Sequence, residues 1–384
     1  MKKLCARLLN SERLHRPKTA RVIAFVILTV CLGSVIVLTG CSTGPSALSG
    51  VIPAPTSGSS ASGTSTSGTS GVAPQVSCAG GRVMTITQPS VYVVQAGHSP
   101  YSVLVFPKTA KGDTPPTAEI PGTLVSLDGA GNIYVLDPSG SCIVEYPALT
   151  SGTPARSLQV GPGTKVSEVK DMAVSQTGEI FVSDGKGIAV FSATANGNAD
   201  PLRYILGVTQ ASAAITPGNI AVDNQDNLYV SNAVDSSVAV FGPTDTGTVI
   251  PARTITGKLS GSGAHFNLGM ATDPSGNLYV LCVCALGEGS GTNAFITFEF
   301  GPKANGTDPP IRWVTSPAMY PWSGGPGIAV DPAGVIYITA GPPIGGAQTI
   351  FEFSPQDSGN ITPVNTVTSV AIWTDTLVSH IAVQ

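Results

Sequence analysis

One short sequence unit recurs along the chain, and this repeat limits the possible folds more than any other feature. Its clearest copy reads NIAVDNQDNLYV at 219–230, followed by SSVAVF at 236–241 and PARTITG at 251–257. Further copies begin near Leu124, Asp171, Gly269 and Gly327. A period of about 50 residues is typical of arrays in which each unit buries its apolar face only against its neighbours.

Each unit predicts four β-strands. The apolar runs are short, rich in β-branched residues and bounded by Gly, Pro, Asn or Asp, as in strands. In the clearest copy we expect strands near 219–222, 227–231, 237–241 and 252–257, with hairpin chemistry in the D-x-x-G-N turn between the first two. An aromatic residue recurs on the second strand, at Tyr92, Tyr134, Phe181, Tyr229, Tyr279 and Tyr337. Four antiparallel strands at this spacing form one blade of a β-propeller.

The two ends of the repeat array complement each other. The copy at Val91 lacks an innermost strand, whereas HIAVQ at 380–384 is an innermost strand without a blade. Pairing them closes the ring and removes an open sheet edge. The sequence therefore predicts an all-β, six-bladed β-propeller of four-stranded antiparallel blades over residues 78–384. In an alternative, residues 83–87 supply the inner strand of the first blade.

The first 40 residues have the pattern of an export signal. Basic residues precede an apolar, uncharged run at 22–38, which is shorter than the about 20 residues of a spanning helix. The LTGC sequence at 38–41 resembles the lipobox of bacterial lipoproteins, which implies lipidation of Cys41 and cleavage before it. The alternative is an uncleaved membrane anchor. We thus expect an extracytoplasmic protein, lipid-anchored at the cell envelope, on an outer membrane or cell surface.

Composition separates a tether from the propeller. Residues 41–77 are almost entirely Ser, Gly, Thr, Ala and Pro after the cysteine, which predicts a disordered linker. Seven of the 19 basic residues and one of the 23 acidic residues precede Cys41, so the chain beyond it has a net charge of about −10. Nucleic-acid binding requires clustered cations, so it is excluded as a function.

Four cysteines fall within the predicted propeller, where an exported location permits disulfides. Cys78 and Cys142 belong to neighbouring blades and are candidates for a bridge, although sequence alone does not fix connectivity. Cys282 and Cys284 are two apart on one strand, about 7 Å, which is long for a mutual disulfide. We expect these two to behave as small buried hydrophobes.

Binding residues are expected on one face of the ring, the top face. Loops that lead into the innermost strands lie on this face, together with loops between second and third strands. The third position after the recurring aromatic holds Gln95, Asp137, Asp184, Asn232, Cys282 and Ala340 in blade order. Oxygen-bearing side chains in four neighbouring blades would suit Ca²⁺ or sugar hydroxyls, although no cofactor is required by the sequence. The simpler interpretation is that they cap turns.

Aromatic residues mark the other half of the top face. Tyr320 and Trp322 precede the last complete blade, Trp373 precedes the closing strand, and Phe266 precedes the blade before. Exposed aromatics there would stack on a sugar or dock a partner protein. Alternatively, they fold inward as a satellite core.

The remaining polar residues give weaker signals. Beyond the signal, the sequence contains three histidines: His98, His265 and His380. Three histidines are able to form a zinc site. Their spacing is not typical of a metal site, so incidental histidines are the simpler interpretation. Turn chemistry accounts for Asp128, Asp223, Asp273 and Asp331. Charges that discourage pairing at sheet edges account for Arg156, Arg203, Arg253 and Arg312.

The repeats at 219–230 and 327–338 resemble those of NHL-repeat propellers and of the wider group that contains the SMP-30/gluconolactonase enzymes. The resemblance implies the fold but leaves activity open, because one fold hosts many functions. Lactonases of that group carry an acid just before the glycine that opens an innermost strand. The matching positions here are not acidic: Lys170, Gly218, Leu268, Pro326 and Ser379. Zinc-bound histidines are implied only by the resemblance to peptide-amidating lyases of the NHL type.

Three hypotheses follow. The first is a non-catalytic module that binds a partner protein or glycan on its top face, without a catalytic residue. The second is a metal-dependent hydrolase or lyase centred on Asp137, Asp184 and Asn232. The third is a structural surface protein without a dedicated ligand. No G-x-S-x-G, H-E-x-x-H or phosphate-loop motif occurs in the sequence.

Overall fold

The computed structural model describes Cys78 and residues 85–95, 101–150, 152–161, 164–256, 266–285, 293–319, 327–340, 349–369 and 380–384. The chain divides into two units, Met1–Ser70 and Gly71–Gln384, and all described residues belong to the second. The expected signal peptide, Cys41 and the tether therefore lie outside the described residues. Within the described part, no helix is long and apolar enough to cross a membrane.

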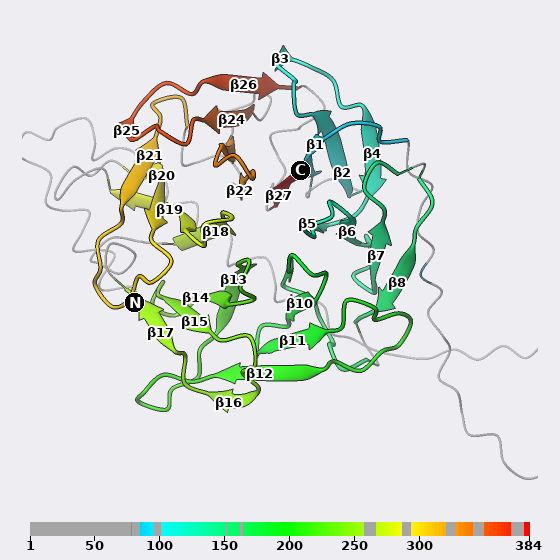
Figure 1. Ribbon diagram of the computed structural model, residues 1–384, viewed down its shortest axis with the longest axis vertical. Helices are drawn as coiled ribbons and strands as arrows, with labels where there is room; N and C mark the ends of the chain where they lie inside the picture. Colours follow the sequence, from blue (N-terminus) through cyan, green and yellow to red (C-terminus); the bar gives the residue numbers. More distant parts are fainter. Residues whose placement is uncertain are drawn as a thin grey trace, which may run out of the picture. The chain divides into compact units, whose positions relative to one another are not determined.

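The described residues form six sheets arranged as the blades of a propeller around a common centre (Figure 1). Blade 1 consists of β27 (Ile381–Val383), β1 (Ser90–Gln95), β2 (Ser102–Pro107) and β4 (Ala118–Pro121). Blade 2 consists of β5 (Leu124–Leu127), β6 (Ile133–Leu136), β7 (Cys142–Tyr146) and β8 (Arg156–Gln159). Blade 3 consists of β9 (Asp171–Val174), β10 (Ile180–Ser183), β11 (Ile188–Phe191) and β12 (Arg203–Gly207), with β16 (Gly247–Val249) added outside.

The other three blades complete the ring. Blade 4 consists of β13 (Pro217–Val222), β14 (Leu228–Asn232), β15 (Val238–Phe241) and β17 (Arg253–Ile255). Blade 5 consists of β18 (Phe266–Thr272), β19 (Leu278–Ala285), β20 (Asn293–Phe300) and β21 (Arg312–Thr315), with β25 (Gly359–Asn360) outside. Blade 6 consists of β22 (Ile328–Val330), β23 (Ile336–Ala340), β24 (Thr349–Phe353) and β26 (Asn365–Thr368), with β3 (Gly112–Asp113) outside. The predicted six-bladed architecture is confirmed.

The ring closes through the C-terminal strand, as expected. β27 pairs antiparallel with β1 at three positions, and it occupies the innermost place of blade 1. The backbone N–H of Val94 donates to the carbonyl oxygen of His380 at 3.0 Å, and that of Gln384 donates to Ser90 at 3.2 Å. The alternative, in which residues 83–87 provide the inner strand, is wrong because β27 fills that place.

The hairpin between the first two strands of a blade follows the turn chemistry expected from D-x-x-G-N. In blade 4, Asp223 accepts hydrogen bonds from the backbone N–H groups of Gln225 and Asn227, both at 2.9 Å. Asp226 takes the left-handed backbone conformation, with φ of 59°. Glycines with φ of 79–89° fill this place in blades 2, 3, 5 and 6: Gly131, Gly178, Gly276 and Gly334.

The recurring aromatic is the centre of a buried polar network. In blade 5, Tyr279 is 2% exposed and its hydroxyl donates to Asp273 at 3.1 Å. Arg312 lies over the ring of Tyr279, forms an ion pair with Glu299, and its Nη1 donates to the Asp357 carbonyl oxygen at 2.8 Å. Burial is the largest cause that raises the pKa of Tyr279.

The outer-strand arginines therefore do not serve as solvent-facing edge charges, and that expectation is wrong. The side chains of Arg156, Arg203 and Arg312 are only 14–19% exposed, and each pairs with a glutamate of its own blade. Arg203 and Arg253 lie over the recurring aromatic of their blades, as Arg312 does. The reason is that the next blade's loop covers the edge, so the guanidinium turns inward.

The cysteine prediction is partly confirmed. Cys78 and Cys142 form a disulfide with a Cα–Cα distance of 5.7 Å. Cys282 is also disulfide-bonded rather than a simple buried hydrophobe, which corrects the expectation for that residue. Its side chain is fully buried in blade 5.

Candidate ligand-binding site

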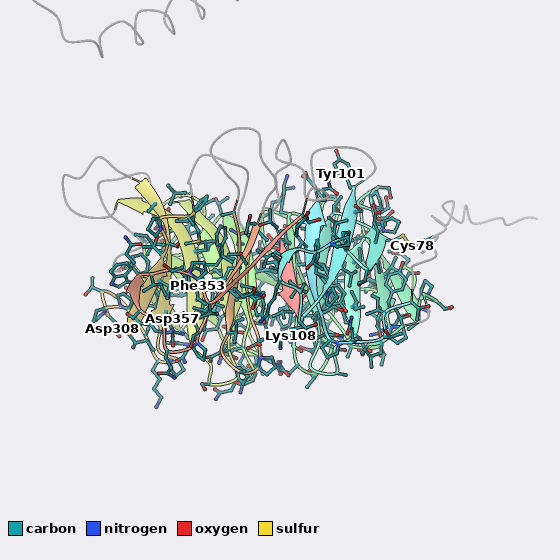
Figure 2. All side chains as sticks on the ribbon, turned by 90° about the horizontal axis from the view of Figure 1, so that it is seen from above. Cys78, Tyr101, Lys108, Asp308, Phe353 and Asp357 are labelled. Atoms are coloured by element: carbon teal, nitrogen blue, oxygen red, sulfur yellow. A yellow bond between two sulfur atoms is a disulfide. The ribbon has the colours of Figure 1, made fainter. Side chains whose placement is uncertain are left out.

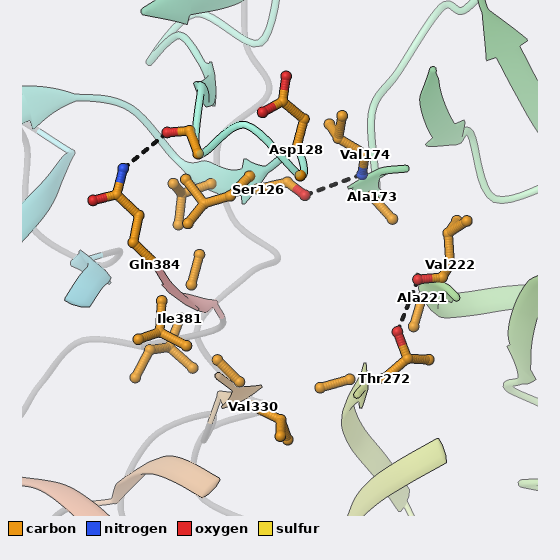
Figure 3. Close-up of a pocket in the computed structure, with 18 of the residues that line it drawn as sticks. Ser126, Asp128, Ala173, Val174, Ala221, Val222, Thr272, Val330, Ile381 and Gln384 are labelled. Atoms are coloured by element: carbon orange, nitrogen blue, oxygen red, sulfur yellow. Dashed lines mark hydrogen bonds between the residues drawn. The ribbon is translucent and has the colours of Figure 1, made fainter. Parts of the chain in front are cut away.

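A cavity of about 810 Å³ occupies the centre of the ring and is lined by residues of all six innermost strands (Figure 3). These strands are β5, β9, β13, β18, β22 and β27. Each pairs with only one neighbour, because it is the first strand of its sheet. Its other edge therefore leaves backbone donors and acceptors toward the cavity. The volume falls within the 300–1,000 Å³ range of ordinary small-ligand pockets.

Small side chains keep the cavity open where six strands converge. We call the first five residues of each repeat, such as GIAVD at 327–331, the repeat head. Its third position is alanine in five blades and serine in the sixth: Ser126, Ala173, Ala221, Ala271, Ala329 and Ala382. Small residues at the narrow end of a blade are the usual solution to its taper. The repeat head thus determines the width of the cavity as well as the strand.

Two side chains cover part of the exposed strand edges. The Ser126 hydroxyl accepts a hydrogen bond from the backbone N–H of Val174 at 3.0 Å, which joins blades 2 and 3. The Thr272 hydroxyl donates to the carbonyl oxygen of Val222 at 2.8 Å, which joins blades 5 and 4 (Figure 3). These bonds satisfy edge groups that the sheets leave unpaired.

Three polar side chains lie at the end of the cavity where the inner strands begin. The first position of the repeat head holds Leu124, Asp171, Asn219, Gly269, Gly327 and His380. All six inner strands run in the same direction through their blades, so these positions share one end of the ring. Asp171, Asn219 and His380 all line the cavity.

Asp171 organises this end. One carboxylate oxygen accepts the N–H of Met172 at 2.7 Å, and the other accepts the N–H of Ile220 in blade 4 at 2.7 Å. The first oxygen also lies 2.6 Å from Nε2 of His380. The Asp171 side chain is 5% exposed and that of His380 is 17% exposed. The pair links the start of the ring-closing strand to blade 3, which is two blades away.

The opposite end of the cavity is bounded by the first hairpins. Lys108 forms an ion pair with Asp331 at 2.8 Å and donates to the backbone oxygen of Gln384 at the same distance. The Gln384 amide donates to the Gly131 carbonyl oxygen at 2.9 Å. Figure 2 shows Lys108 on the side of the ring opposite to Tyr101, which belongs to the top face. The two ends of the cavity are therefore chemically different.

Of the four polar residues predicted for the top face, Asp137, Asp184 and Asn232 accept side-chain hydrogen bonds within their own blade. Asp137 accepts backbone N–H bonds from Ser141 and Cys142 at 2.8 and 2.7 Å. Asp184 accepts from Lys186, Gly187 and the Tyr204 hydroxyl: 2.9, 2.9 and 2.6 Å. Asn232 accepts from Thr216 and Val234, and Gln95 ends β1 opposite Ser102. These contacts fit the turn-capping interpretation, and the described cavity lining includes none of the four.

The other predicted residues are only partly described. Tyr320, Trp322, Trp373, His98 and His265 lie outside the described residues, and the side chain of Phe266 is not described. His380 is described, and its Nε2 lies 2.6 Å from a carboxylate oxygen of Asp171. Among the described residues, no group of three or more His, Cys, Asp and Glu side chains is placed to hold a metal ion.

The polar end of the cavity was missed by the sequence reasoning, although a signal for it exists. The comparison with lactonases used the position before the glycine of the repeat head, which gave Lys170 and Gly218. The position of the glycine itself holds Asp171 and Asn219. Four copies depart from glycine at this position, and three of them place a polar side chain, Asp171, Asn219 or His380, in the cavity lining.

Comparisons with known proteins support the fold. No family model matches the sequence, and no curated protein matches it. A protein of unknown function from Bacteroides caccae is similar in structure, with a TM-score of 0.50 and 14% identity over 77% of this chain and 99% of that chain. A gluconolactonase from Xanthomonas campestris has a TM-score of 0.40 and 13% identity over 76% of this chain and 91% of that chain. Identities this low concern the fold alone.

Proposed function

We propose that the protein is a non-catalytic binding module that holds a glycan in its central cavity. The observation that carries the proposal is the polar end formed by Asp171, Asn219 and His380 in a cavity of about 810 Å³. Carboxylate, amide, imidazole and unpaired strand-edge groups together offer donors and acceptors to a ligand rich in hydroxyls. The second and fourth positions of the repeat head, which are apolar except for Thr272, supply contact area for the sugar rings.

A glycan fits this site better than a folded partner protein. A cavity lined by six strands admits a short chain of small units, whereas a protein would contact only the loops around it. We retain Tyr320, Trp322 and Trp373, which lie outside the described residues, as proposed stacking residues for the glycan. The polar half-ring of Gln95, Asp137, Asp184 and Asn232 remains the alternative place of binding on the top face.

We further propose that the module belongs to the NHL-like propellers and is a lipoprotein, anchored through Cys41 and tethered outside the cytoplasm. The support is the LTGC sequence at 38–41, the Ser/Gly/Thr-rich stretch after it and the disulfide between Cys78 and Cys142. Disulfides persist in exported proteins and are rare in the cytosol of most organisms. Labelling with a palmitate analogue tests the anchor, because a Cys41→Ser variant should incorporate none.

The binding test uses the full chain in detergent on an array of envelope and host glycans. We expect at least one hit that Asp171→Asn and Asn219→Ala each weaken by about tenfold or more, the equivalent of one lost buried hydrogen bond to a charged group. Asp235→Asn, an exposed turn carboxylate outside the cavity lining, is the matched control. Weakening by Asp184→Ala alone would move the site to the top-face half-ring, and the absence of any hit on the array would contradict the proposal.

Catalysis is tested on the same material. Turnover of lactones or peptides that depends on a stoichiometric metal, with loss of both on Asp184→Ala, would replace the binding proposal with the hydrolase or lyase alternative. The experiment distinguishes the two functions because Asp184 lies outside the cavity lining. Glycan binding in the cavity would depend on Asp171 and Asn219, whereas turnover would depend on Asp184.

A further inference from the structure

The junction between blades 1 and 2 is built differently from the other five. At each of those, within the described residues, the loop before a blade's outer strand pairs with the outer strand of the preceding blade. Three such loops form strands, β16 on β12, β25 on β21 and β3 on β26. Two form single parallel bridges, Gly197 to Leu158 and Gly306 to Ile255. No such pairing joins β4 to the described part of the corresponding loop of blade 2.

The N-terminal segment contacts this loop instead. The backbone N–H of Ile86 donates to the carbonyl oxygen of Thr150 in the blade 2 loop at 2.8 Å. The Ile86 side chain is 4% exposed and packs in one core cluster with Ile120 of blade 1 and Ile133 of blade 2. The N-terminal segment around Ile86 therefore packs against both blade 1 and blade 2.

A covalent bond fastens the same segment. Cys78 packs against that cluster and forms the disulfide with Cys142 on β7. We call Cys78 together with residues 85–89 the clasp. Figure 2 shows Cys78 at the outer rim of the ring, away from the central cavity.

The disulfide of the clasp closes a loop of the chain that includes most of blade 1. The disulfide spans a sequence separation of 64 residues, and the loop it closes contains the strands β1, β2, β3, β4, β5 and β6. Every strand of blade 1 except β27 lies inside this loop. The pairing of β1 with β27 covers three positions. The backbone already joins blade 1 to blade 2 between Pro121 and Leu124, and the clasp adds a second covalent tie on the N-terminal side of β1.

We propose that the clasp protects the propeller from tension applied through its N-terminal segment. Without it, a pull on that segment would act first on Ser90 and peel β1 from β27 and β2, opening the ring at its closure. With it, the pull passes from Cys78 to Cys142. That residue begins β7, which is paired on both sides by β6 and β8. This role is independent of what the cavity binds, and it suits a domain held by its N-terminal side.

A force-clamp measurement tests the clasp. The full chain in detergent is held between its N-terminus and a ligation tag inserted at Val234, an exposed turn residue of blade 4. At constant force, we expect the lifetime of the intact ring to fall at least about tenfold in Cys78→Ser relative to wild type, a change of one order of magnitude in the rate of opening. Cys282→Ser, which removes a disulfide in blade 5, is the control and should keep the wild-type pathway of first opening.

A second experiment tests the proposal without requiring the Cys78→Ser variant to fold. The Cys282→Ser protein is folded with its clasp intact and then reduced while it is held, so the same molecule is measured with and without the bond. A shorter lifetime after reduction, with β1 released in the first event, supports the proposal. Equal lifetimes before and after reduction, or first opening at a blade other than blade 1, would overturn it.

Discussion

Replacing Asp171 with alanine should destabilise the ring more than its position beside an open cavity suggests. Its carboxylate accepts hydrogen bonds from the N–H groups of Met172 and Ile220 and contacts Nε2 of His380: 2.7, 2.7 and 2.6 Å. Leaving two buried backbone donors unpaired costs about 1–3 kcal/mol each, and the lost hydrogen bond to His380 adds to this cost. We therefore expect a loss of about 3–5 kcal/mol in the free energy of unfolding.

Equilibrium unfolding in urea, followed by tryptophan fluorescence and circular dichroism, measures this loss. Asp235→Ala is the matched control, because that exposed carboxylate also accepts a backbone N–H, from Ser237 at 3.0 Å, and should cost about 1 kcal/mol. A double-mutant cycle with His380→Ala should give a coupling of about 1–3 kcal/mol. A loss below about 1 kcal/mol for Asp171→Ala, or additive effects in the cycle, would refute the reasoning.

Two further predictions concern the buried networks. Arg312→Ala should cost about 3–5 kcal/mol in urea unfolding, because it leaves Glu299 buried without its partner, whereas the exposed Lys303→Ala should stay within about 0.5 kcal/mol. Burial raises the pKa of Tyr146 to about 12, so the folded state favours the neutral phenol. The contribution of Tyr146 to the free energy of unfolding is therefore fully present below pH 10, and it should be lost as the pH rises through about 12. Phenolate absorbance complete by pH 10 with the fold intact would contradict this.

The sequence predicts the architecture of this protein well because its repeats encode local chemistry. The D-x-x-G-N turn specifies a hairpin through Asp223 and a left-handed residue at position 226, and both are present. The incomplete copies at Val91 and at 380–384 specify how the ring closes, and β1 and β27 pair accordingly. The turn depends on contacts within a few residues, and the ring closure joins two incomplete repeats that are recognisable in the sequence.

Features that depend on contacts between blades were harder to predict. Arg312 was assigned to a sheet edge because the sequence does not show that the loop containing β25 covers that edge. The contact between Asp171 and His380 joins residues 209 apart in sequence, and only ring geometry brings them together. The candidate site therefore emerged from the structure, whereas its positions were already marked in the repeat as departures from glycine.

The crystal structure of the chain with a glycan identified on the array tests the central claim most directly. The account predicts electron density for the sugar in the central cavity, with its hydroxyls within hydrogen-bond distance of Asp171 and Asn219. Density confined to the top face around Asp137, Asp184 and Asn232, with the cavity filled only by water, would contradict it.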